Sequence, residues 1–493
     1  MKNVFYKPAG AFAGDFIPFY KDGLFRLFYL LDWRDKDNHG EGTPWYQITT
    51  RDFVGFAEHG EMVPRGTEKD QDLYVFTGSL LEAQRIYHIF YTGHNPYFPK
   101  QGKPQQAVMH AVSNDLLRWK KVPEDTFFAP SGSDSLYEPH DWRDPFVFYN
   151  DQAQEYWMLL AARLKTGSSR RRGCIALCTS RDLKSWSVRD PFWAPGLYYM
   201  HECPDLFKMG DWWYLVYSTF SERYVTHYRM SKNLKGPWKA PENDTFDGRA
   251  FYAAKTWSDG KKRYAFGWNP TREEESDRGT WQWGGNLVVH EIVQEIDGYL
   301  VVQVPGTVDI LFSIPMEMDV IPRKGAWKVN DGVLTAEAPD SFAYALAGKL
   351  PAQCKISGTI TFGPNTRGCG IMVNADKDGE SSYYIRIEPG RDRLVLDVWP
   401  RKGDLPFMVE LERPIKLIPD KSYDITIFLD GSICVVYLGR KIAMNARLYD
   451  LKEDGWGLFV NEGSAKFDGF SVMTISPSTD GVSNISRFGL ELI

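Results

Sequence analysis

Short segments of apolar or alternating residues, separated by Gly, Asp, Asn and Pro, recur along the whole chain. Helical periodicity is scarce, and the segments have the length and the flanking turn residues that are typical of β-strands. Clear examples are Leu24–Leu31, Ile86–Tyr91, Tyr156–Ala161, Trp213–Tyr217 and Arg263–Trp268. The pattern predicts an all-β protein.

A short motif that combines Ser or Thr, Asp or Asn and an aromatic residue recurs in the first half of the chain. The two clearest copies are Ser113–Trp119 and Ser180–Trp186, and two looser copies are Thr50–Phe56 and Ser231–Trp238. Each copy follows a strand-like segment, and the polar side chains of such motifs bond the backbone of a turn. A spacing of roughly 50 to 70 residues is enough for a four-stranded sheet with loops. These copies, with further strands at 251–268, predict a five-bladed β-propeller.

The pattern changes near Pro305, and from about Lys355 the strands alternate more cleanly. Asp430 and Gly431 stand between two of these strands, which is a strong hairpin signal. Repeated strands of this length with turns between them predict a two-sheet β-sandwich. We therefore expect a propeller over residues 1–310, a linker over 311–330, and a β-sandwich with a C-terminal tail over 331–493.

Composition narrows the classes of function. The formal net charge is -6, so no basic field would attract nucleic acid or an anionic membrane. The cysteines are scattered, without a Cys/His cluster at metal-ligand spacing, so we expect neither a metal nor a cofactor. No segment has the length of a signal peptide or a membrane span, which predicts a cytoplasmic protein. The sequence leaves the oligomeric state open.

Three acidic residues stand at the heads of strand-like segments: Asp15, Asp144 in a Trp-Arg-Asp-Pro run, and Glu202 before Cys-Pro-Asp. The innermost strands of propeller blades begin beside a central channel, so these acids can converge on one pocket. Cleavage of a glycosidic bond needs one acid to protonate the leaving oxygen. It also needs a second carboxylate to attack the anomeric carbon or to activate water. The three acids are therefore the candidate catalytic residues.

The neighbours of each acid suggest different tasks. Glu202 is the best proton donor by position, because partly desolvated surroundings favour a protonated carboxyl. The glycine directly before Asp15 would let a ligand approach closely. Arg143 beside Asp144 would keep that carboxylate ionised, which suits a residue that accepts hydrogen bonds from sugar hydroxyls.

These motifs resemble glycoside hydrolase family 32, the fructan-cleaving enzymes related to invertase and levanase. Arg143–Pro145 resembles the RDP motif of that family, and Glu202–Pro204 resembles its ECP motif. Phe76–Ser79 resembles its FSGS segment, and the stretches 251–255 and 265–268 resemble its FYA and GW segments. The nucleophile motif is divergent: this chain has Phe-Ala-Gly-Asp-Phe-Ile-Pro where the family usually has Trp-Met-Asn-Asp-Pro-Asn-Gly.

The resemblance implies a five-bladed propeller followed by a β-sandwich, with retaining cleavage of a terminal β-fructofuranosyl unit. By motif, Asp15 would be the nucleophile that forms a fructosyl ester, Asp144 would stabilise the transition state, and Glu202 would be the general acid/base. The expected substrate is a short or unusual fructoside or fructo-oligosaccharide. The further candidates for substrate binding are Arg143, Trp33, Trp45, Phe76, Thr77, Tyr137, His201 and Trp268.

Two alternatives remain open. An inverting hydrolase of arabinan or xylan oligosaccharides, of the family 43 type, also uses two Asp and one Glu on a propeller, and the separation of its carboxyl groups would be wider. A carbohydrate-binding protein without catalysis is the other alternative, because the residues around Asp15 depart from the family pattern.

Overall fold

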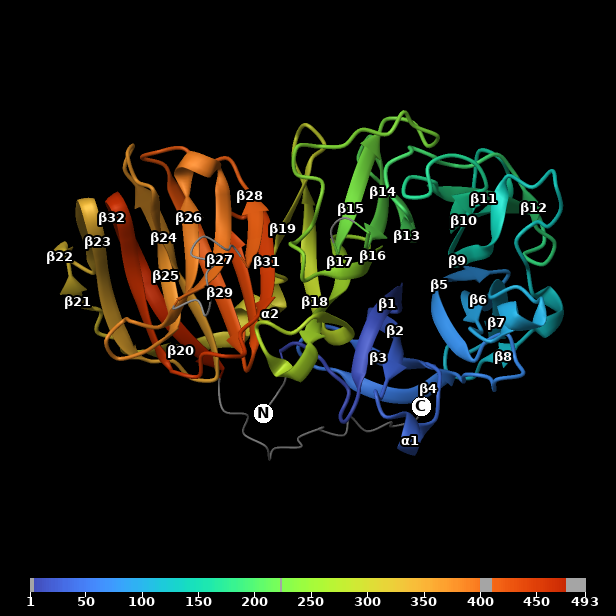
Figure 1. The fold of residues 1–493 in the computed structure, drawn as a ribbon, viewed down its shortest axis with the longest axis horizontal. Helices are drawn as coiled ribbons and strands as arrows, with labels where there is room; N and C mark the ends of the chain where they lie inside the picture. The colour runs from blue at the N-terminus through green and yellow to red at the C-terminus, as the bar shows by residue number, and fades with distance from the viewer. Residues whose placement is uncertain (1–3, 222–223, 400–409, 476–493) are drawn as a thin grey trace, which may run out of the picture.

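A computed structural model of the protein describes residues 4–221, 224–399 and 410–475. Strands make up most of this part of the chain, and its helices are short, so the predicted all-β class is confirmed. Figure 1 shows two bodies: the N-terminal strands, blue to yellow-green, form one, and the C-terminal strands, golden yellow to red, form the other. No helix in the described part is long and apolar enough to cross a membrane.

The N-terminal body begins with antiparallel runs of consecutive strands. The first run consists of β1 (Phe12–Lys21), β2 (Leu24–Asp32), β3 (Trp45–Thr50) and β4 (Ala57–Val63), with α1 (Lys36–His39) between β2 and β3. The second run consists of β5 (Tyr74–Ala83), β6 (Ile86–His94), β7 (Gln106–Ser113) and β8 (Lys120–Lys121).

Further runs complete this body. The third consists of β9 (Tyr137–Asn150), β10 (Glu155–Leu164), β11 (Gly173–Ser180) and β12 (Ser187–Val188). The next consists of β13 (Glu202–Met209), β14 (Trp212–Thr219) and β15 (Val225–Ser231). The last consists of β16 (Tyr252–Ser258), β17 (Arg263–Arg272), β18 (Trp281–Gln294) and β19 (Leu300–Gln303). It joins the first run through β18 and β1, at the pair Ala13 and Gly285.

The first strands of these runs form a closed ring. β1 contacts β5, β5 contacts β9, β9 contacts β13, β13 contacts β16, and β16 contacts β1. We call these the inner strands. Sheets arranged around a ring of inner strands are the architecture of a β-propeller, and the N-terminal body has that architecture.

The repeated polar motif forms the same turn at each clear copy, as predicted. The Ser113 hydroxyl accepts the backbone N–H of Leu116 at 2.9 Å, and the Asp115 carboxylate accepts the two following N–H groups. The copy at Ser180 repeats these bonds. Leu116 and Leu183 have φ of 64° and 63° and are buried. The motif thus closes each of these turns and anchors it with one apolar side chain.

The C-terminal body is a β-sandwich. Its strands are β20 (Phe312–Met316), β21 (Ile321–Lys324), β22 (Ala326–Asn330), β23 (Val333–Lys349), β24 (Gln353–Phe362), β25 (Gly368–Ala375), β26 (Ser382–Glu388), β27 (Arg393–Trp399), β28 (Leu411–Pro414), β29 (Ser422–Asp430), β30 (Ile433–Leu438), β31 (Ile442–Arg447) and β32 (Gly455–Ile475). The long β32 pairs with β20, β23, β24 and β25 and so connects the layers. Between the layers lies a core of aliphatic side chains from both.

The segment 311–330, which the sequence assigns to a linker, belongs to the sandwich sheets. β20 pairs with β32, and β21 and β22 pair with β23. The expectation fails because the residues of β21 and β22 are mostly exposed and lack the apolar alternation that marks a half-buried strand. The short helix α2 (Gly306–Leu311) directly precedes these strands. Residues 476–493 of the expected tail lie outside the described residues.

A buried polar network joins the two bodies. His290 of β18 contacts Asp247 through Nε2 at 2.8 Å and the hydroxyl of Tyr437 in β30 through Nδ1 at 2.8 Å. The backbone N–H of Asn445 in β31 donates to the same Asp247 carboxylate at 2.8 Å. Because buried polar groups are costly to leave unpaired, this network holds the sandwich in a fixed position against the propeller.

Candidate active site

Each inner strand is interrupted by a β-bulge. The register shifts lie between Gly14 and Ile17, between Phe76 and Gly78, between Arg143 and Phe146, between Glu202 and Asp205, and between Tyr252 and Lys255. Asp15, Asp144, Cys203 and Ala253 have positive φ, from 47° to 59°. A bulge re-aims a side chain out of the regular alternation of a strand. Two of the predicted acids are thus bulge residues themselves, and the third, Glu202, directly precedes one.

Asp15 is partly buried and receives two hydrogen bonds. The Thr77 hydroxyl donates to its Oδ2 at 2.8 Å, and the indole Nε1 of Trp268 donates to its Oδ1 at 3.2 Å. Burial raises the pKa of Asp15 to about 7, against the effect of the bond from Thr77. The negative charges of Asp144 and Glu202 raise this pKa further. The three predicted acids therefore interact within one electrostatic site.

Asp144 is buried and forms hydrogen bonds with two other strands, β13 and β6. Its Oδ2 accepts the backbone N–H of Cys203 at 2.9 Å, and its own N–H donates to the Thr92 hydroxyl at 2.7 Å. Burial raises the pKa of Asp144 to about 6, the guanidinium of Arg143 opposes this rise, and the charge of Glu202 adds to it. These contacts fix the carboxylate in one orientation, which suits a group that holds sugar hydroxyls.

Glu202 is held by two donors and remains accessible. Arg143 donates to its Oε1 from Nη2 at 2.9 Å and from Nε at 3.2 Å, and the Tyr252 hydroxyl donates to its Oε2 at 2.6 Å. The side chain of Glu202 keeps 18% of its surface exposed, so a leaving group or a water molecule can reach it. Two fixed donors on a reachable carboxylate are suited to proton transfer at a defined position.

The sequence predicts that Arg143 chiefly accompanies Asp144, and here the structure differs. The guanidinium binds Glu202 and, through Nη1 at 2.8 Å, Asp141, whereas its Nε lies 3.9 Å from Asp144 Oδ2. Both residues lie at the bulge of β9, where the regular alternation of side chains breaks, and both reach β13: Arg143 binds Glu202, and Asp144 binds the Cys203 N–H. The positive charge of Arg143 therefore interacts more directly with Glu202 than with Asp144.

An aromatic wall surrounds the acids. The ring of Tyr252 stacks on Tyr224, with centroids 3.9 Å apart and planes at 6°, and Trp268 meets Tyr252 edge-on at 5.9 Å. Trp283 lies 5.8 Å from Trp268. A Cβ on Gly14 would lie 2.6 Å from the ring of Trp283. Glycine at this position is therefore required for the tryptophan to pack beside the bulge of β1.

The other predicted binding residues fall into two groups. Thr77 and Trp268 bind Asp15 directly, although Trp268 has no exposed surface. Phe76 is partly exposed and stacks on His94 with centroids 4.6 Å apart, and Trp33 is partly exposed and stacks on His39. These rings keep surface that a sugar could contact.

Trp45, Tyr137 and His201 lie in the interior, which corrects their expected role as sugar-contacting residues. Trp45 is 0% exposed and its Nε1 donates to the carbonyl of Phe76, and Tyr137 is 1% exposed. His201 is 0% exposed, and burial lowers the pKa of its imidazole to about 3. Their aromatic type suggested sugar stacking, but a ring without exposed surface packs the core instead.

Sequence reasoning missed three residues of the site. Tyr252 stands in the recognised FYA-like stretch, but the motif gives no reason to aim its hydroxyl at Glu202. Tyr224 and Trp283 reach the site through packing against Tyr252 and Trp268, and their own sequence surroundings carry no signal. The sequence assigns the space beside Gly14 to an approaching ligand, whereas in the structure the ring of Trp283 occupies it.

Comparison with known proteins identifies the family. The N-terminal domain of glycosyl hydrolases family 32 matches residues 16–305, and a family 32 C-terminal domain of the BT1760-like type matches residues 298–472. The first match begins directly after Asp15, so the assignment of that residue depends on the geometry described above.

Named relatives with similar sequences are consistent with this family. Sucrose-6-phosphate hydrolase of Vibrio alginolyticus is 28% identical over 52% of this chain and 54% of its own length. A levanbiose-producing levanase of Bacillus subtilis (strain 168) is 27% identical over 51% of this chain and 45% of its own length. The chain thus matches only about half the length of these relatives.

A solved structure matches the fold of this chain over a longer span than the sequence relatives do. The structure of sucrose-6-phosphate hydrolase from Lactobacillus gasseri superimposes with a TM-score of 0.71, at 17% identity, over 97% of this chain and 93% of that one. Both domain matches cover consecutive parts of the sequence and meet near α2. The chain therefore belongs to glycosyl hydrolase family 32.

Proposed function

We propose that this protein is a retaining glycoside hydrolase that removes a terminal β-fructofuranosyl unit from a short fructoside or fructo-oligosaccharide. The observation that carries the proposal is the electrostatic coupling of Asp15, Asp144 and Glu202 at the bulges of neighbouring inner strands. Family membership adds support, and the names of the relatives, sucrose-6-phosphate hydrolase and levanase, are consistent with a fructosyl donor.

The first step uses Asp15 and Glu202. The Asp15 carboxylate attacks the anomeric carbon of the fructosyl unit, the bond to the leaving oxygen breaks, and Glu202 gives its proton to that oxygen. Asp144 accepts hydrogen bonds from fructosyl hydroxyls, which strengthen as positive charge develops on the ring. In the second step water attacks the same carbon, Glu202 takes its proton, and the ester bond to Asp15 breaks.

The contacts of each acid support these roles. The bonds from Thr77 and Trp268 favour the carboxylate form of Asp15, which is the form that attacks. Arg143 and Tyr252 hold the two oxygens of Glu202 from different sides, so its proton has a defined direction. We also assign Phe76 and Trp33 as contacts for the leaving group, because these rings keep exposed surface.

We further propose that the propeller has five blades, one for each inner strand, with β18 and β1 closing the ring. A cytoplasmic location fits the cysteines, which are free and buried, because reducing compartments keep thiols unpaired. The proposed substrate partner is a small carbohydrate.

Incubation with defined sugars tests the proposal. The enzyme is expected to release fructose from at least one of sucrose, kestose, inulobiose and levanbiose, and the first product seen by NMR is expected to keep the β configuration. Release of arabinose from arabino-oligosaccharides, or a product of inverted configuration, would support the family 43 alternative. Release of no sugar from any substrate would support a binding protein without catalysis.

A further inference from the structure

The outer face of one sandwich sheet forms a groove far in sequence from the catalytic acids. In β26 the side chains of Ile385 and Ile387 enter the core, while Tyr384, Arg386 and Glu388 alternate to the outside and line the groove. The cavity has a volume of about 1030 Å³. Because pockets for drug-sized ligands typically span roughly 300–1,000 Å³, this groove has room for several linked sugar units.

One side of the groove is aromatic. Phe342 of β23 stacks on Phe459 of β32 with centroids 5.9 Å apart, and Tyr384 of β26 meets Phe459 edge-on at 5.0 Å. Phe342 and Tyr384 are partly exposed, whereas Phe459 is buried beneath them. Phe342 and Tyr384 are thus held against a buried third ring by three different strands, and their exposed ring surface is available with little loss of side-chain entropy on binding.

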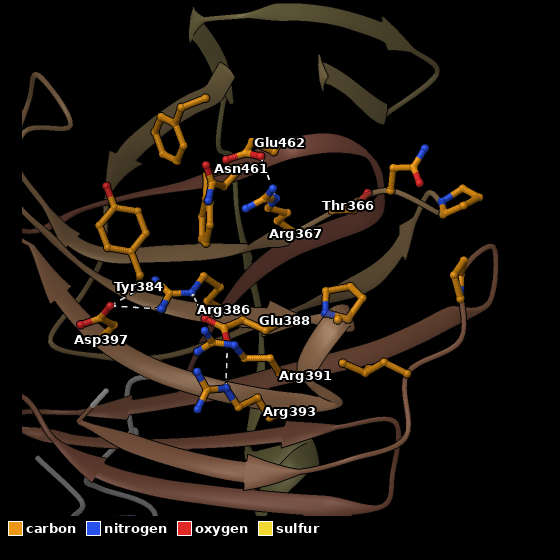
Figure 2. Close-up of a pocket in the computed structure, with 18 residues that line it drawn as sticks. Thr366, Arg367, Tyr384, Arg386, Glu388, Arg391, Arg393, Asp397, Asn461 and Glu462 are labelled. Carbon is orange, nitrogen blue, oxygen red and sulfur yellow. Dashed lines mark hydrogen bonds and ion pairs between the residues drawn. The ribbon is translucent and has the colours of Figure 1, made fainter. Parts of the chain in front are cut away.

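The other side of the groove is charged, and its charges are paired. Figure 2 shows Arg386 between Asp397 and Glu388, Arg393 against Glu388, and Arg367 against Glu462. The Arg386 Nη1 to Asp397 Oδ2 distance is 3.1 Å, and the Arg393 Nε to Glu388 Oε2 distance is 2.7 Å. These pairs fix donors and acceptors side by side on neighbouring strands.

This balance of charge indicates a neutral ligand. A phosphate or carboxylate ligand would need cations that are free to bind it, but Arg386, Arg393 and Arg367 are already neutralised by their carboxylate partners. Arg391, for which the described residues provide no ion pair, is an exposed residue of the groove lining near Arg393. A ligand with hydroxyl groups can both donate to the carboxylates and accept from the guanidinium groups, while its apolar face covers the rings.

A second cavity lies beside this groove, between the sandwich and the propeller. Arg391 and Arg393 also line a cavity of about 770 Å³ between the two bodies, whose propeller wall includes Tyr198 and His227. The ring of Tyr198 lies 5.5 Å from that of His201, which directly precedes Glu202 in the chain. The shared arginines make the two cavities neighbours, and the polar network around His290 fixes the bodies that form them.

We infer that the groove is a second carbohydrate site, which binds an internal stretch of a β-fructan chain while the end of such a chain enters the catalytic site. This inference depends on the proposed function for the identity of the sugar. The paired charges beside partly exposed rings, together with the proposed fructosidase activity, favour a neutral chain of linked fructosyl units as the occupant over an anionic ligand.

Binding is tested first, with full-length protein made inactive by Glu202→Gln. The protein is run by native electrophoresis in gels that contain inulin or levan, and it is expected to be retarded in at least one of them. Adding Tyr384→Leu, which keeps apolar volume against Phe459, or Arg391→Ala, which removes an exposed side chain, is expected to abolish most of the retardation. Tyr149→Leu and Arg170→Ala, both exposed residues of the propeller, serve as matched controls and are expected to run like the parent.

Kinetic measurements on the active enzyme test whether the groove contributes to the cleavage of a polymer. Tyr384→Leu and Arg391→Ala are each expected to leave kcat/KM for a fructosyl disaccharide within about twofold. For the polymer, loss of one aromatic contact is expected to lower kcat/KM by about tenfold, mainly through KM. Circular dichroism and thermal unfolding of each variant confirm that it is folded.

The outcomes separate the inference from the proposed function. Equal losses on disaccharide and polymer, no loss on either, or retardation that the control variants also abolish would overturn the groove site. Release of inulin or levan by millimolar inorganic phosphate would mean an anion site and would also overturn it. Groove-dependent retardation without release of fructose from any substrate would support the site and overturn the proposed catalysis.

Discussion

The inner strands of the propeller and the strands β26 to β31 of the sandwich differ in how regularly they pair. Each inner strand shifts register at the bulge described above, and four of these bulges contain a residue with positive φ. In the sandwich, the strands β26 to β31 pair without a shift, whereas β32 shifts register against β20, β23, β24 and β25. Both regions have buried strands, so burial does not explain the difference.

We interpret the difference as one between strands that present catalytic side chains and strands that only pack. A regular strand alternates its side chains, so each residue faces either the core or the outside. A bulge breaks that alternation and lets a polar residue such as Asp15 or Asp144 leave a buried strand toward the ring centre. Backbone strain of this kind persists where the surrounding structure holds it in place. The proposed catalytic acids lie at the irregular strands, whereas the charged side of the proposed groove lies on the regular strands β26 and β27.

The largest effect is expected from Asp15→Asn. Removal of the proposed nucleophile should lower kcat/KM by at least about 10⁴-fold, as for other covalent catalysts. The same change should stabilise the fold at alkaline pH. The pKa of Asp15 is raised in the folded state, so its carboxylate destabilises the protein as pH rises through about 7, and its neutral form does not. Thermal unfolding should show a gain over wild type that is larger at pH 8 than at pH 5.

A conservative change elsewhere on the same strand provides the control. Lys21→Gln, at the end of β1, alters the exposed pair with Glu82 and should change neither activity nor the pH dependence of stability. If Asp15→Asn kept more than about one per cent of the activity, Asp15 would not be the nucleophile, because loss of a covalent catalyst leaves far less.

Glu202→Gln should have the next largest effect, a loss of about 10²–10⁴-fold in kcat, because general acid catalysis contributes this much. The amide keeps the volume and can still accept from Arg143, so the fold should be unchanged by circular dichroism. The loss should be much smaller for an activated fructoside whose leaving group needs no proton. Equal loss on both kinds of substrate would contradict the acid role.

The all-β class, the turn motif and the candidate acids could be predicted from sequence, whereas the bulges could not, and the limits have physical reasons. The turn motif around Ser113 and Ser180 acts locally, so it was readable, and the acids were found because each heads a strand-like segment. The roles of Tyr252 and Trp283 depend on contacts between strands far apart in the chain, and the burial of Trp45 depends on what packs against it. The strands within 311–330 were missed because exposed residues carry little periodic signal.

Thr77→Val should have a moderate effect that depends on pH. Valine keeps the shape of threonine but removes the hydroxyl that donates to Asp15 Oδ2. The lost bond stabilises the carboxylate form, so its removal should raise the pKa of Asp15 above its present value of about 7. Because Asp15 must be deprotonated to attack, the acidic limb of the kcat/KM profile should move up by about one pH unit.

The pH profile itself supplies the control for this variant. Activity at pH 6 should fall about tenfold relative to wild type, while the plateau at higher pH should be nearly restored. Thr359→Val, on the exposed surface of the sandwich, should leave the whole profile unchanged. A uniform loss at every pH for Thr77→Val would mean that the residue supports structure and does not adjust the nucleophile.

The smallest effects on turnover are expected from cavities in the two kinds of strand, and they test the comparison most directly. Leu30→Ala removes a buried side chain opposite Gly14, and Ile385→Ala removes one from the regular strand β26. Each should lower the free energy of unfolding by about 2–5 kcal/mol. At 25 °C, Leu30→Ala should lower kcat severalfold, because the bulge that aims Asp15 loses its support, whereas Ile385→Ala should leave kcat unchanged. Stopped assays on purified, folded protein measure both. If the sandwich variant lowered kcat as much as the propeller variant, catalysis would not depend specifically on the irregular strands, and the comparison would be wrong.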